Sequence, residues 1–215
     1  MKVKICGITD LTTALAAIDY GADAIGFVFA ESKRRISVEK AKDIVTHLPK
    51  DILKVGVFVN EVKEKIEEIA SCVGLTHVQL HGDETPAFSQ SLSLPVIKAI
   101  SVNDDQSLNA IENHSCEYVL IDGPKGKYGG GNGLAFDWNC ISANQIKNKK
   151  VILAGGLHEV NVEEAIRLIK PYMVDVSSGV ETEGKKDLDK IQSFINKAKG
   201  SHTGGTRNEV IYTAE

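Results

Sequence analysis

The sequence of 215 residues has few of the features that mark secreted, disulfide-stabilised proteins. Its four cysteines, Cys6, Cys72, Cys116 and Cys140, lie far apart and form no C-x-x-C pair, so no disulfide framework is indicated. Met1 is followed by Lys-Val-Lys and not by a long apolar signal segment. A chain of this length can bury a sizeable core without covalent staples. We therefore expect a reduced, cytoplasmic protein.

Long apolar runs and an excess of positive charge are also missing. No stretch approaches the roughly 18 uninterrupted apolar residues of a membrane span. The net charge is −4, which argues against a nucleic-acid surface. With 42% hydrophobic and 25% charged residues, the composition fits one globular domain. A small-molecule enzyme is the leading expectation, with neither a membrane nor a nucleic acid as partner, and the sequence does not indicate an oligomeric state.

What the sequence does contain is a repeating unit. A short apolar run rich in β-branched residues is followed each time by a helical stretch, at a spacing of about 24 residues that suits one strand, one helix and two short loops. Eight units predict a closed (β/α)8 TIM barrel, with a doubly wound open sheet as the alternative. The runs are Lys2–Ile8, Ala24–Phe29, Lys54–Val59, His77–His81, Val96–Ile100, Tyr118–Asp122, Val151–Gly155 and Met173–Ser177.

Signals for helix ends support this interpretation of the segments between the runs. After the third run, Asn60 is expected to cap a helix that Gly74 closes, with apolar residues at helical spacing between them. The repeat continues without a break to Gly200. We therefore expect residues 1–200 to form a single barrel domain and the polar residues 201–215 to form a flexible tail.

In a barrel of this kind the active site lies at the carboxyl ends of the strands, so polar residues there are the first candidates. The first run brings Cys6 to this face, and the sixth brings Asp122. A strand cysteine is commonly a small buried hydrophobe. An ionisable group at the end of an apolar strand must instead be exposed in the cleft, hydrogen-bonded or functional. Because their strands lie on different sides of the ring, Cys6 and Asp122 could act on opposite sides of a bound substrate.

The last two runs are followed by turns that contain glycine. Gly155 and Gly156 follow the seventh run, and Ser178 and Gly179 follow the eighth. The loops at these two places often bind phosphate in TIM barrels, through backbone N–H groups and the start of a short extra helix. Two tight turns without a ligand are the simpler alternative. The occurrence of both turns in the expected pair of loops predicts a phosphorylated small molecule as ligand.

Three further segments have a functional and a structural interpretation. Residues 123–133 fit no nucleotide-binding motif and are expected to form either a mobile loop over the active-site mouth or a plain connector. Arg34 and Arg35 belong to a basic cluster that could bind a carboxylate or form a solvated loop. His81 ends the fourth run, but no paired carboxylates accompany it, so it is expected to be structural and no metal site is predicted.

Seven segments of the sequence occur together in one enzyme family. They are Lys4–Thr9, Gly26–Phe29 with Ser32–Arg34, Gly56–Asn60, Val78–Gly82, Phe136–Trp138, Ala154–Leu157 and Asp175–Glu181. In this order they resemble the phosphoribosylanthranilate isomerases of tryptophan biosynthesis, over about residues 2–199. The resemblance implies a TIM barrel that needs no cofactor and acts on a phosphorylated small molecule.

The resemblance also implies a reaction and a role for each candidate residue. The reaction is the Amadori rearrangement of N-(5-phosphoribosyl)anthranilate to 1-(2-carboxyphenylamino)-1-deoxyribulose 5-phosphate. Asp122 would be the general acid that opens the furanose ring, and Cys6 the general base that removes the C2′ proton. Arg34 would bind the anthranilate carboxylate, although Arg35 could also reach it. The residues implied for the phosphate are Gly155, Gly156, Ser178 and Gly179.

Both catalytic roles require a shift from the usual protonation states. The ordinary pKa values, about 8.5 for Cys and about 3.9 for Asp, leave the base mostly protonated and the acid mostly ionised at neutral pH. Partial burial would raise the pKa of Asp122, whereas Lys4 or helix N–H groups could favour the Cys6 thiolate.

Two other classes of protein remain as alternatives. One is another barrel that processes phosphosugars, such as a ribulose-phosphate epimerase or an indole-glycerol-phosphate synthase. The other is a non-catalytic barrel that binds a phosphorylated ligand. The second alternative predicts phosphate loops without an acid and a base, so the presence of both Cys6 and Asp122 argues against it.

Overall fold

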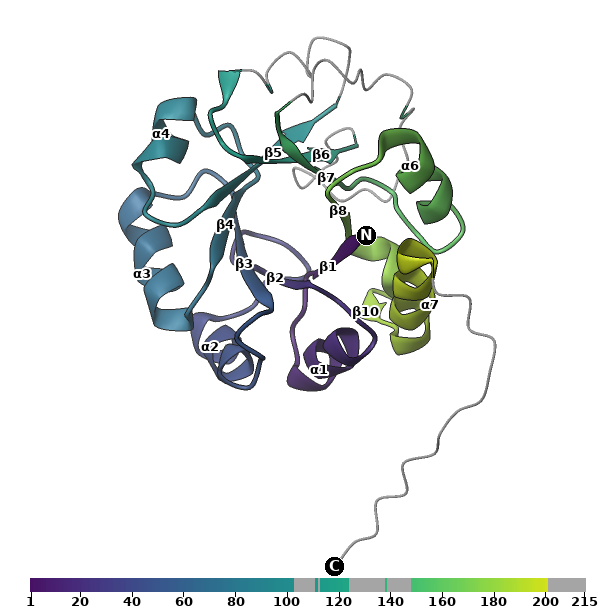
Figure 1. The fold of residues 1–215 in the computed structure, drawn as a ribbon. Coiled ribbons are helices and arrows are strands. Elements are labelled where there is room, and N and C mark those ends of the chain that lie inside the picture. Colours follow the sequence, from purple (N-terminus) through teal and green to yellow (C-terminus); the bar gives the residue numbers. More distant parts are fainter. Residues whose placement is uncertain (103–110, 112, 124–137, 139–147, 201–215) are drawn as a thin grey trace, which may run out of the picture.

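The eight apolar runs form eight parallel strands in the computed structural model, which describes residues 1–102, 111, 113–123, 138 and 148–200. Each strand pairs with the next one in the sequence, and the eighth pairs with the first to close a barrel (Figure 1). The (β/α)8 barrel prediction is confirmed, and the open sheet is excluded. The strands are β1 (Lys2–Cys6), β2 (Ala24–Val28), β3 (Leu53–Phe58), β4 (His77–Leu80), β5 (Val96–Ser101), β6 (Tyr118–Asp122), β7 (Lys150–Leu153) and β8 (Met173–Val176).

Helices cover the outside of this barrel (Figure 1). They are α1 (Leu11–Asp19), α2 (Val38–Thr46), α3 (Lys63–Val73), α4 (Pro86–Ser91), α6 (Val162–Ile169) and α7 (Leu188–Lys199). Their apolar sides and the outward sides of the strands share one buried cluster, as Ile66 and Val73 of α3 and Val78 of β4 illustrate. Full burial of such a side chain contributes about 1.5–3 kcal/mol. The packed shell between helices and strands therefore holds the barrel closed.

The segment between β8 and α7 has additional structure. A single turn of 3₁₀ helix, η2 (Ser178–Val180), follows β8. A small antiparallel hairpin of β9 (Glu181–Thr182) and β10 (Lys185–Lys186) comes next. The flexible tail expected over 201–215 lies outside the described residues.

Of the two residues predicted to end the helix after the third run, one is confirmed and the other is not. Gly74 closes α3 in the left-handed conformation, at φ +81°, as predicted. The prediction for Asn60 is wrong, because α3 begins only at Lys63, after Val62. Asn60 itself has φ +49°, and its side-chain oxygen accepts a hydrogen bond from the backbone N–H of Asp83 at 2.8 Å. Its side chain thus joins two neighbouring loops instead of capping the helix.

Alternate strand residues face the barrel interior and form two levels. Ala24, Val55, Leu120 and Ile152 belong to one buried apolar cluster. Two residues further along β6, towards its carboxyl end, Asp122 lines a pocket. The interior is therefore filled with apolar side chains at one level and becomes polar and hollow where the strands end.

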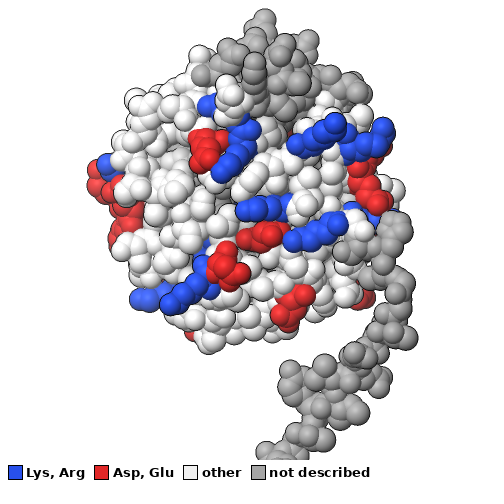
Figure 2. Space-filling view, viewed as in Figure 1, with Lys and Arg blue, Asp and Glu red and all other residues white. Residues whose placement is uncertain are grey.

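Charges of both signs are interspersed over the face seen in Figure 2. Several cations at the surface of the described residues pair with a carboxylate, as in Lys199 with Asp23 at 2.9 Å and Lys150 with Glu117 at 2.7 Å. This face thus lacks the broad positive patch that nucleic-acid binding requires. No helix among the described residues is long and apolar enough to cross a membrane.

A buried ion pair connects the loops that follow β3 and β4. The Lys98 ammonium, on the outward side of β5, donates to Glu84 Oε2 and to the Gly82 carbonyl, both at 2.7 Å. Glu84 also accepts hydrogen bonds from the backbone N–H groups of Asn60 and Gly82. Burial acts to raise the pKa of Glu84, but Lys98 and the backbone N–H groups of Asn60 and of Glu84 itself lower it below its usual range. The pair thus fixes the two loops beside the pocket.

We predict that Glu84→Gln lowers the free energy of unfolding by about 3 kcal/mol at pH 7, because it leaves the buried Lys98 charge without its partner. The depressed folded pKa makes this contribution complete above the ordinary Glu value of about 4.3 and lost as the pH falls through the folded value. The difference between variant and wild type should therefore shrink in acid, as urea titrations would measure. Glu68→Gln, which breaks an exposed pair with Lys65, should change stability by less than about 1 kcal/mol. Equal effects of the two substitutions would show that the Glu84 pair does not hold the loops.

Candidate active site

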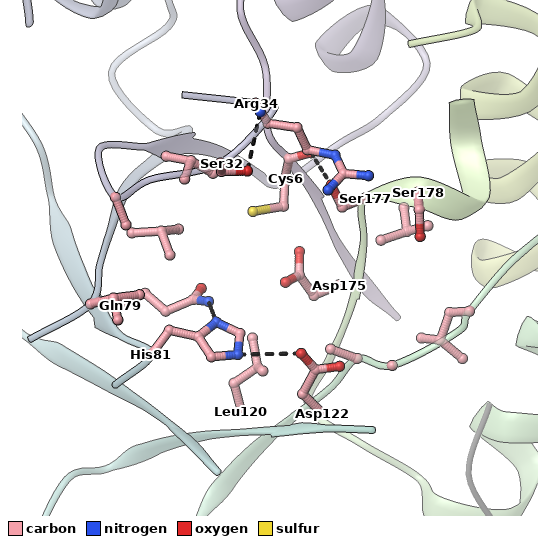
Figure 3. A pocket seen from close by; sticks show the side chains of 18 of the residues that line it. Cys6, Ser32, Arg34, Gln79, His81, Leu120, Asp122, Asp175, Ser177 and Ser178 are labelled. Atoms are coloured by element: carbon pink, nitrogen blue, oxygen red, sulfur yellow. Dashed lines mark hydrogen bonds and ion pairs between the residues drawn. The ribbon is translucent and has the colours of Figure 1, made fainter. Parts of the chain in front are cut away.

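A pocket opens at the carboxyl ends of the strands, where the barrel interior becomes polar (Figure 3). Cys6 comes from the end of β1, Asp122 from the end of β6 and Asp175 from β8, while His81 directly follows β4. Figure 3 shows the Cys6 thiol and the Asp122 carboxyl group on opposite sides of this pocket. The structure therefore brings together both strand-end residues that the sequence singles out, across a space that a small molecule can occupy.

The Cys6 thiol lies in a crowded, charged corner of the pocket. Beside it on the interior of β1, the fully buried Lys4 donates to both carboxylate oxygens of Asp175 at 3.0 Å. Gly26 is opposite Cys6 in the β1–β2 register, and a Cβ there would lie 2.8 Å from the sulfur. The absence of a side chain at Gly26 thus makes the space that the thiol occupies.

The net electrostatic effect on Cys6 differs from the expectation. Burial raises the pKa of the thiol, and the negative charge of Asp175 raises it further. Lys4 and Lys186 act in the opposite direction, as expected for Lys4, but they do not outweigh burial. The net direction is upward, so these surroundings favour the protonated form of the Cys6 thiol. Lys4 by itself does favour the thiolate, as expected. The combined effect of burial and all nearby charges favours the thiol instead.

Asp122 is held from two sides. One carboxylate oxygen, Oδ1, accepts a hydrogen bond from the N–H of Gly123 at 2.8 Å. The other, Oδ2, lies 3.3 Å from His81 Nε2, within ion-pairing distance, although the ring N–H direction does not give a well-formed hydrogen bond. The buried Gln79 amide nitrogen lies 3.2 Å from His81 Nδ1. If this amide donates to Nδ1, the ring hydrogen is on Nε2 and faces Asp122.

The role expected for His81 therefore needs correction, since its ring belongs to the pocket and touches the candidate acid. The local sequence shows no partner for His81, because the carboxylate comes from β6, 41 positions further along the chain. The period of two along a strand does place Gln79 and His81 on one face. Which strand lies opposite that face is decided only by barrel closure.

The glycine turns after β7 and β8 meet at the pocket. Gly155, at φ +80°, Gly156, at φ +66°, and Ser178, the first residue of η2, all line it. Gly179 does not line the pocket. A Cβ on Gly179 would overlap the backbone carbonyl oxygen of Leu157, so this glycine lets the two loops pack against each other. Three of the four residues expected at the phosphate thus line the pocket, and the fourth supports them from behind.

The two neighbouring arginines are in different places. Arg34 lines the pocket, and its guanidinium makes a two-pronged ion pair with Glu181, at 2.7 and 2.8 Å. Arg35 is exposed and does not line this pocket. The sequence left either arginine as the carboxylate ligand, and the geometry favours Arg34. Glu181 and its second partner, Lys186, had no expected role, since nothing in the local sequence links them to Arg34.

Two remaining expectations concern the loop after β6 and metal binding. Residues 124–133 of the expected mobile loop lie outside the described residues, and only Gly123 is seen. Within the described part of the chain, no group of three or more His, Cys, Asp or Glu side chains could hold a metal ion. The pocket as described thus offers proton-transfer groups and hydrogen-bond donors for a ligand.

Fold and site together define a class, an enzyme of the TIM-barrel type with a thiol and a carboxyl group facing each other below two glycine-containing loops. The model of the N-(5'-phosphoribosyl)anthranilate (PRA) isomerase family matches residues 3–197. The chain belongs to this family, and the family resemblance found in the sequence is confirmed.

Individual relatives agree with this assignment along the whole barrel. The chain is 55% identical over 200 residues to the N-(5'-phosphoribosyl)anthranilate isomerase of Bacillus cereus (strain B4264) and 56% identical over 201 residues to that of Bacillus mycoides (strain KBAB4). Each match covers 93% of this chain and 98% of the relative. The solved phosphoribosyl anthranilate isomerase of Thermotoga maritima has a TM-score of 0.87 at 44% identity, with 93% of this chain and 99% of that one covered.

We predict that Gly155→Ala lowers kcat/KM by about 10²-fold, a loss typical of a small displacement of reacting groups. A Cβ at this position would overlap the backbone nitrogen of Gly123 and lie 3.0 Å from Asp122 Oδ1. Gly200→Ala is the matched control, because Gly200 has a similar φ of +70° but a Cβ there would meet no described residue within 4 Å beyond its chain neighbours. Both should lose about 1–2 kcal/mol of stability from backbone strain, with a further loss for Gly155→Ala from the overlap, and only Gly155→Ala should lose activity in a steady-state assay. Wild-type kcat/KM in Gly155→Ala would contradict the close packing of this loop on Asp122.

Proposed function

We propose that this chain converts N-(5-phosphoribosyl)anthranilate to 1-(2-carboxyphenylamino)-1-deoxyribulose 5-phosphate in tryptophan biosynthesis, with Cys6 as general base and Asp122 as general acid. The observation that carries the proposal is the placement of the two groups on opposite sides of one pocket (Figure 3). A solved family structure, 43% identical with a TM-score of 0.81, is a complex with reduced 1-(o-carboxyphenylamino)-1-deoxyribulose 5-phosphate. Its ligand supports a phosphorylated small molecule as the substrate class here.

The proposed reaction depends on two proton transfers by the protein, on opposite sides of the sugar, followed by a tautomerisation. Asp122 donates a proton to the furanose ring oxygen, the C1′–O bond breaks, and the nitrogen lone pair forms a protonated Schiff base. Cys6, as thiolate, then takes the C2′ proton, and the electrons of that C–H bond form an enolamine. The enolamine loses its C2′ hydroxyl proton and gains one at C1′ to give the ketone. Positioned acids and bases contribute about 10²–10⁴-fold each to such steps.

The residues around the pair fit these roles. Cys6 must reach the thiolate form against its burial, and Lys4 and Lys186 are the nearby positive charges that favour that form. Asp122 is oriented by the Gly123 N–H, and its second oxygen lies beside His81. The carboxyl group is thus held in one rotamer, which a directed proton transfer requires.

We further propose that Arg34 binds the anthranilate carboxylate, and that Gly155, Gly156 and Ser178, supported by Gly179, bind the phosphate. Gly155 and Gly156 have no side chain between their backbone and the pocket, and Ser178 adds a hydroxyl group, which suits phosphate binding. The cysteines of the described chain, Cys6, Cys72 and Cys116, are free. Free cysteines fit a reducing compartment, and we propose the cytoplasm.

The central prediction concerns the two catalytic side chains. In an assay that follows the loss of anthranilate-type fluorescence from freshly generated substrate with EDTA present, Cys6→Ser and Asp122→Asn should each lower kcat by at least about 10²-fold, because each removes one proton transfer. Both variants should still bind the reduced product analogue in calorimetric titrations. Cys72→Ser, which changes an exposed free cysteine, should keep wild-type turnover.

Each failure has its own meaning. Near-normal turnover of either variant would remove that residue from the mechanism. A folded wild-type protein without turnover of this substrate would refute the proposed reaction itself.

A second prediction separates the two arginines. Arg34→Ala should raise KM by about 10–100-fold, the loss expected for a charge-assisted pair of hydrogen bonds worth about 1.5–3 kcal/mol. Arg35→Ala, at an exposed position outside the pocket, should leave KM unchanged. Steady-state kinetics at equal enzyme concentration would measure both. A raised KM in Arg35→Ala with a normal value in Arg34→Ala would move carboxylate binding to Arg35.

A further inference from the structure

The hairpin of β9 and β10 reaches back to the pocket and binds the arginine that faces it. Glu181 Oε1 accepts a hydrogen bond from Arg34 Nε at 2.7 Å, and Oε2 accepts one from Nη2 at 2.8 Å. The Glu181 side chain is only 8% exposed. We propose that Glu181 is a positioning residue that orients the Arg34 guanidinium, with Lys186 as charge partner, and so makes the pocket selective for a ligand with a carboxylate on its aromatic ring. This inference rests on the proposed carboxylate-binding role of Arg34.

The two-pronged pairing determines which part of Arg34 remains for a ligand. A guanidinium has five N–H donors in one plane. Glu181 takes the Nε–H and one Nη2–H, and three donors remain, two of which lie on the edge formed by Nη1 and Nη2. That edge matches the spacing of the two oxygens of a carboxylate. Glu181 therefore fixes both the plane of the guanidinium and the edge that is offered to the pocket.

The stem of Arg34 is confined from the other side. Gly7, which follows β1, has φ +78°, and a Cβ there would lie 2.6 Å from Arg34 Cδ. Figure 3 shows the Arg34 side chain passing next to Cys6 and towards Ser177 and Ser178. Gly7 leaves space for the aliphatic part of Arg34, and Glu181 binds its guanidinium. The side chain is therefore already ordered before a ligand binds, which lowers the entropy lost on binding.

Lys186 supplies a second positive charge to the same carboxylate. Its ammonium donates to Glu181 Oε1 and to the Ser177 carbonyl, both at 2.8 Å, and lies 3.3 Å from Ser177 Oγ. Ser177 Oγ itself donates to the Cys6 carbonyl, so it can accept from Lys186. Three acceptors around the nitrogen match the three hydrogens of an ammonium group. Burial lowers the pKa of Lys186, whereas Glu181 acts to raise it.

The net charge of Arg34, Glu181 and Lys186 allows these three residues to attract an anion. Arg34 and Glu181 alone would be neutral and would have little attraction for an anion. With Lys186, two cations share one carboxylate, and one positive charge is left over at the pocket wall. The neighbouring pair of Lys4 and Asp175 is neutral as a unit. An incoming carboxylate would thus complete the pairing of a partly buried charge, which is favourable in a site shielded from water.

The hairpin turn keeps Glu181 and Lys186 together. Lys186 is opposite Glu181 in the β9–β10 register. The two residues between the strands, Glu183 at φ +52° and Gly184 at φ +77°, have the paired positive φ values of a tight two-residue hairpin turn. Lys190, on α7, donates to the Glu181 carbonyl at 2.9 Å. The hairpin is therefore fixed to α7, and the Glu181 carboxylate that binds Arg34 is held by the fold itself.

The test compares two ligands that differ only in the carboxylate. Calorimetric titrations would use reduced 1-(o-carboxyphenylamino)-1-deoxyribulose 5-phosphate and its counterpart with an unsubstituted phenyl ring. Glu181→Gln should weaken binding of the first at least about tenfold, because the loss from misaligned charge-assisted hydrogen bonds exceeds the gain from the added positive charge. It should change binding of the second less than about twofold. In steady-state assays the same variant should raise KM with little change in kcat.

Matched variants separate positioning from a merely structural effect. Glu163→Gln changes a half-exposed glutamate on α6 that pairs with Lys197 and should leave both affinities unchanged. Glu181→Asp keeps the negative charge and should restore part of the affinity for the carboxylated ligand, and it provides the test if Glu181→Gln fails to fold. In an Arg34→Ala background, Glu181→Gln should add no further loss, because its effect is exerted through Arg34.

Four results would count against the proposal. An equal loss for both ligands would show that Glu181 supports the whole pocket, and no loss for either would show that Arg34 needs no partner. Wild-type affinity in Glu181→Asp would show that the position of the carboxylate is unimportant, and an additive loss in the Arg34→Ala background would show an independent role. Failure of the wild-type protein to bind either ligand would instead refute the proposed function.

Discussion

The pairing of β1 with β8 is the contact on which the arrangement of the site depends. In its register Lys4 is opposite Asp175, and their side chains form a buried ion pair inside the barrel. This pairing joins residues 171 positions apart and converts a row of strands into a ring. Only in a ring does the end of β1 face the end of β6, so that a thiol and a carboxyl group lie across one space. Closure therefore creates the pocket as well as the fold.

Three buried or partly buried ion pairs lie near the pocket, and they share a physical logic. Lys4 with Asp175, Lys98 with Glu84, and Arg34 with Glu181 each bring a cation and a carboxylate out of water. The desolvation cost of such pairs can exceed their attraction, so they are poor sources of stability. What they provide is direction, because each charged group has a small number of partners at fixed positions. The result is a set of oriented side chains on the same end of the barrel.

Burial and charge also act against each other in the chemistry. The thiol of Cys6, which we propose as the general base, is buried beside the pocket, and burial raises its pKa. Lys4 and Lys186 counter this effect only in part. Two glycines also help to position these groups. Gly26 leaves space for the thiol, and Gly155 leaves space for the carboxyl group of Asp122. The two side chains proposed as base and acid are thus positioned by the glycines beside them as well as by their hydrogen bonds and ion pairs.

The sequence by itself determined the strands and the residues at their ends. Apolar runs at a regular spacing predict eight strands, because a strand between helices and a barrel interior must be apolar on both faces. A residue that ends such a run, as Cys6 and Asp122 do, is then at the mouth of the barrel. Local chemistry also predicts the left-handed end of α3 at Gly74. These features depend on residues that are close together in the sequence, so the sequence pattern predicts them.

Tertiary structure alone decided the contacts between distant segments. Asn60 was expected to cap a helix, but its side chain bonds to the next loop. His81 meets Asp122, and Arg34 meets Glu181 147 positions away, only because the ring closes. The direction of the Cys6 pKa likewise depends on burial summed over several strands. Such effects depend on which side chains come together in space, and neither period nor composition specifies that.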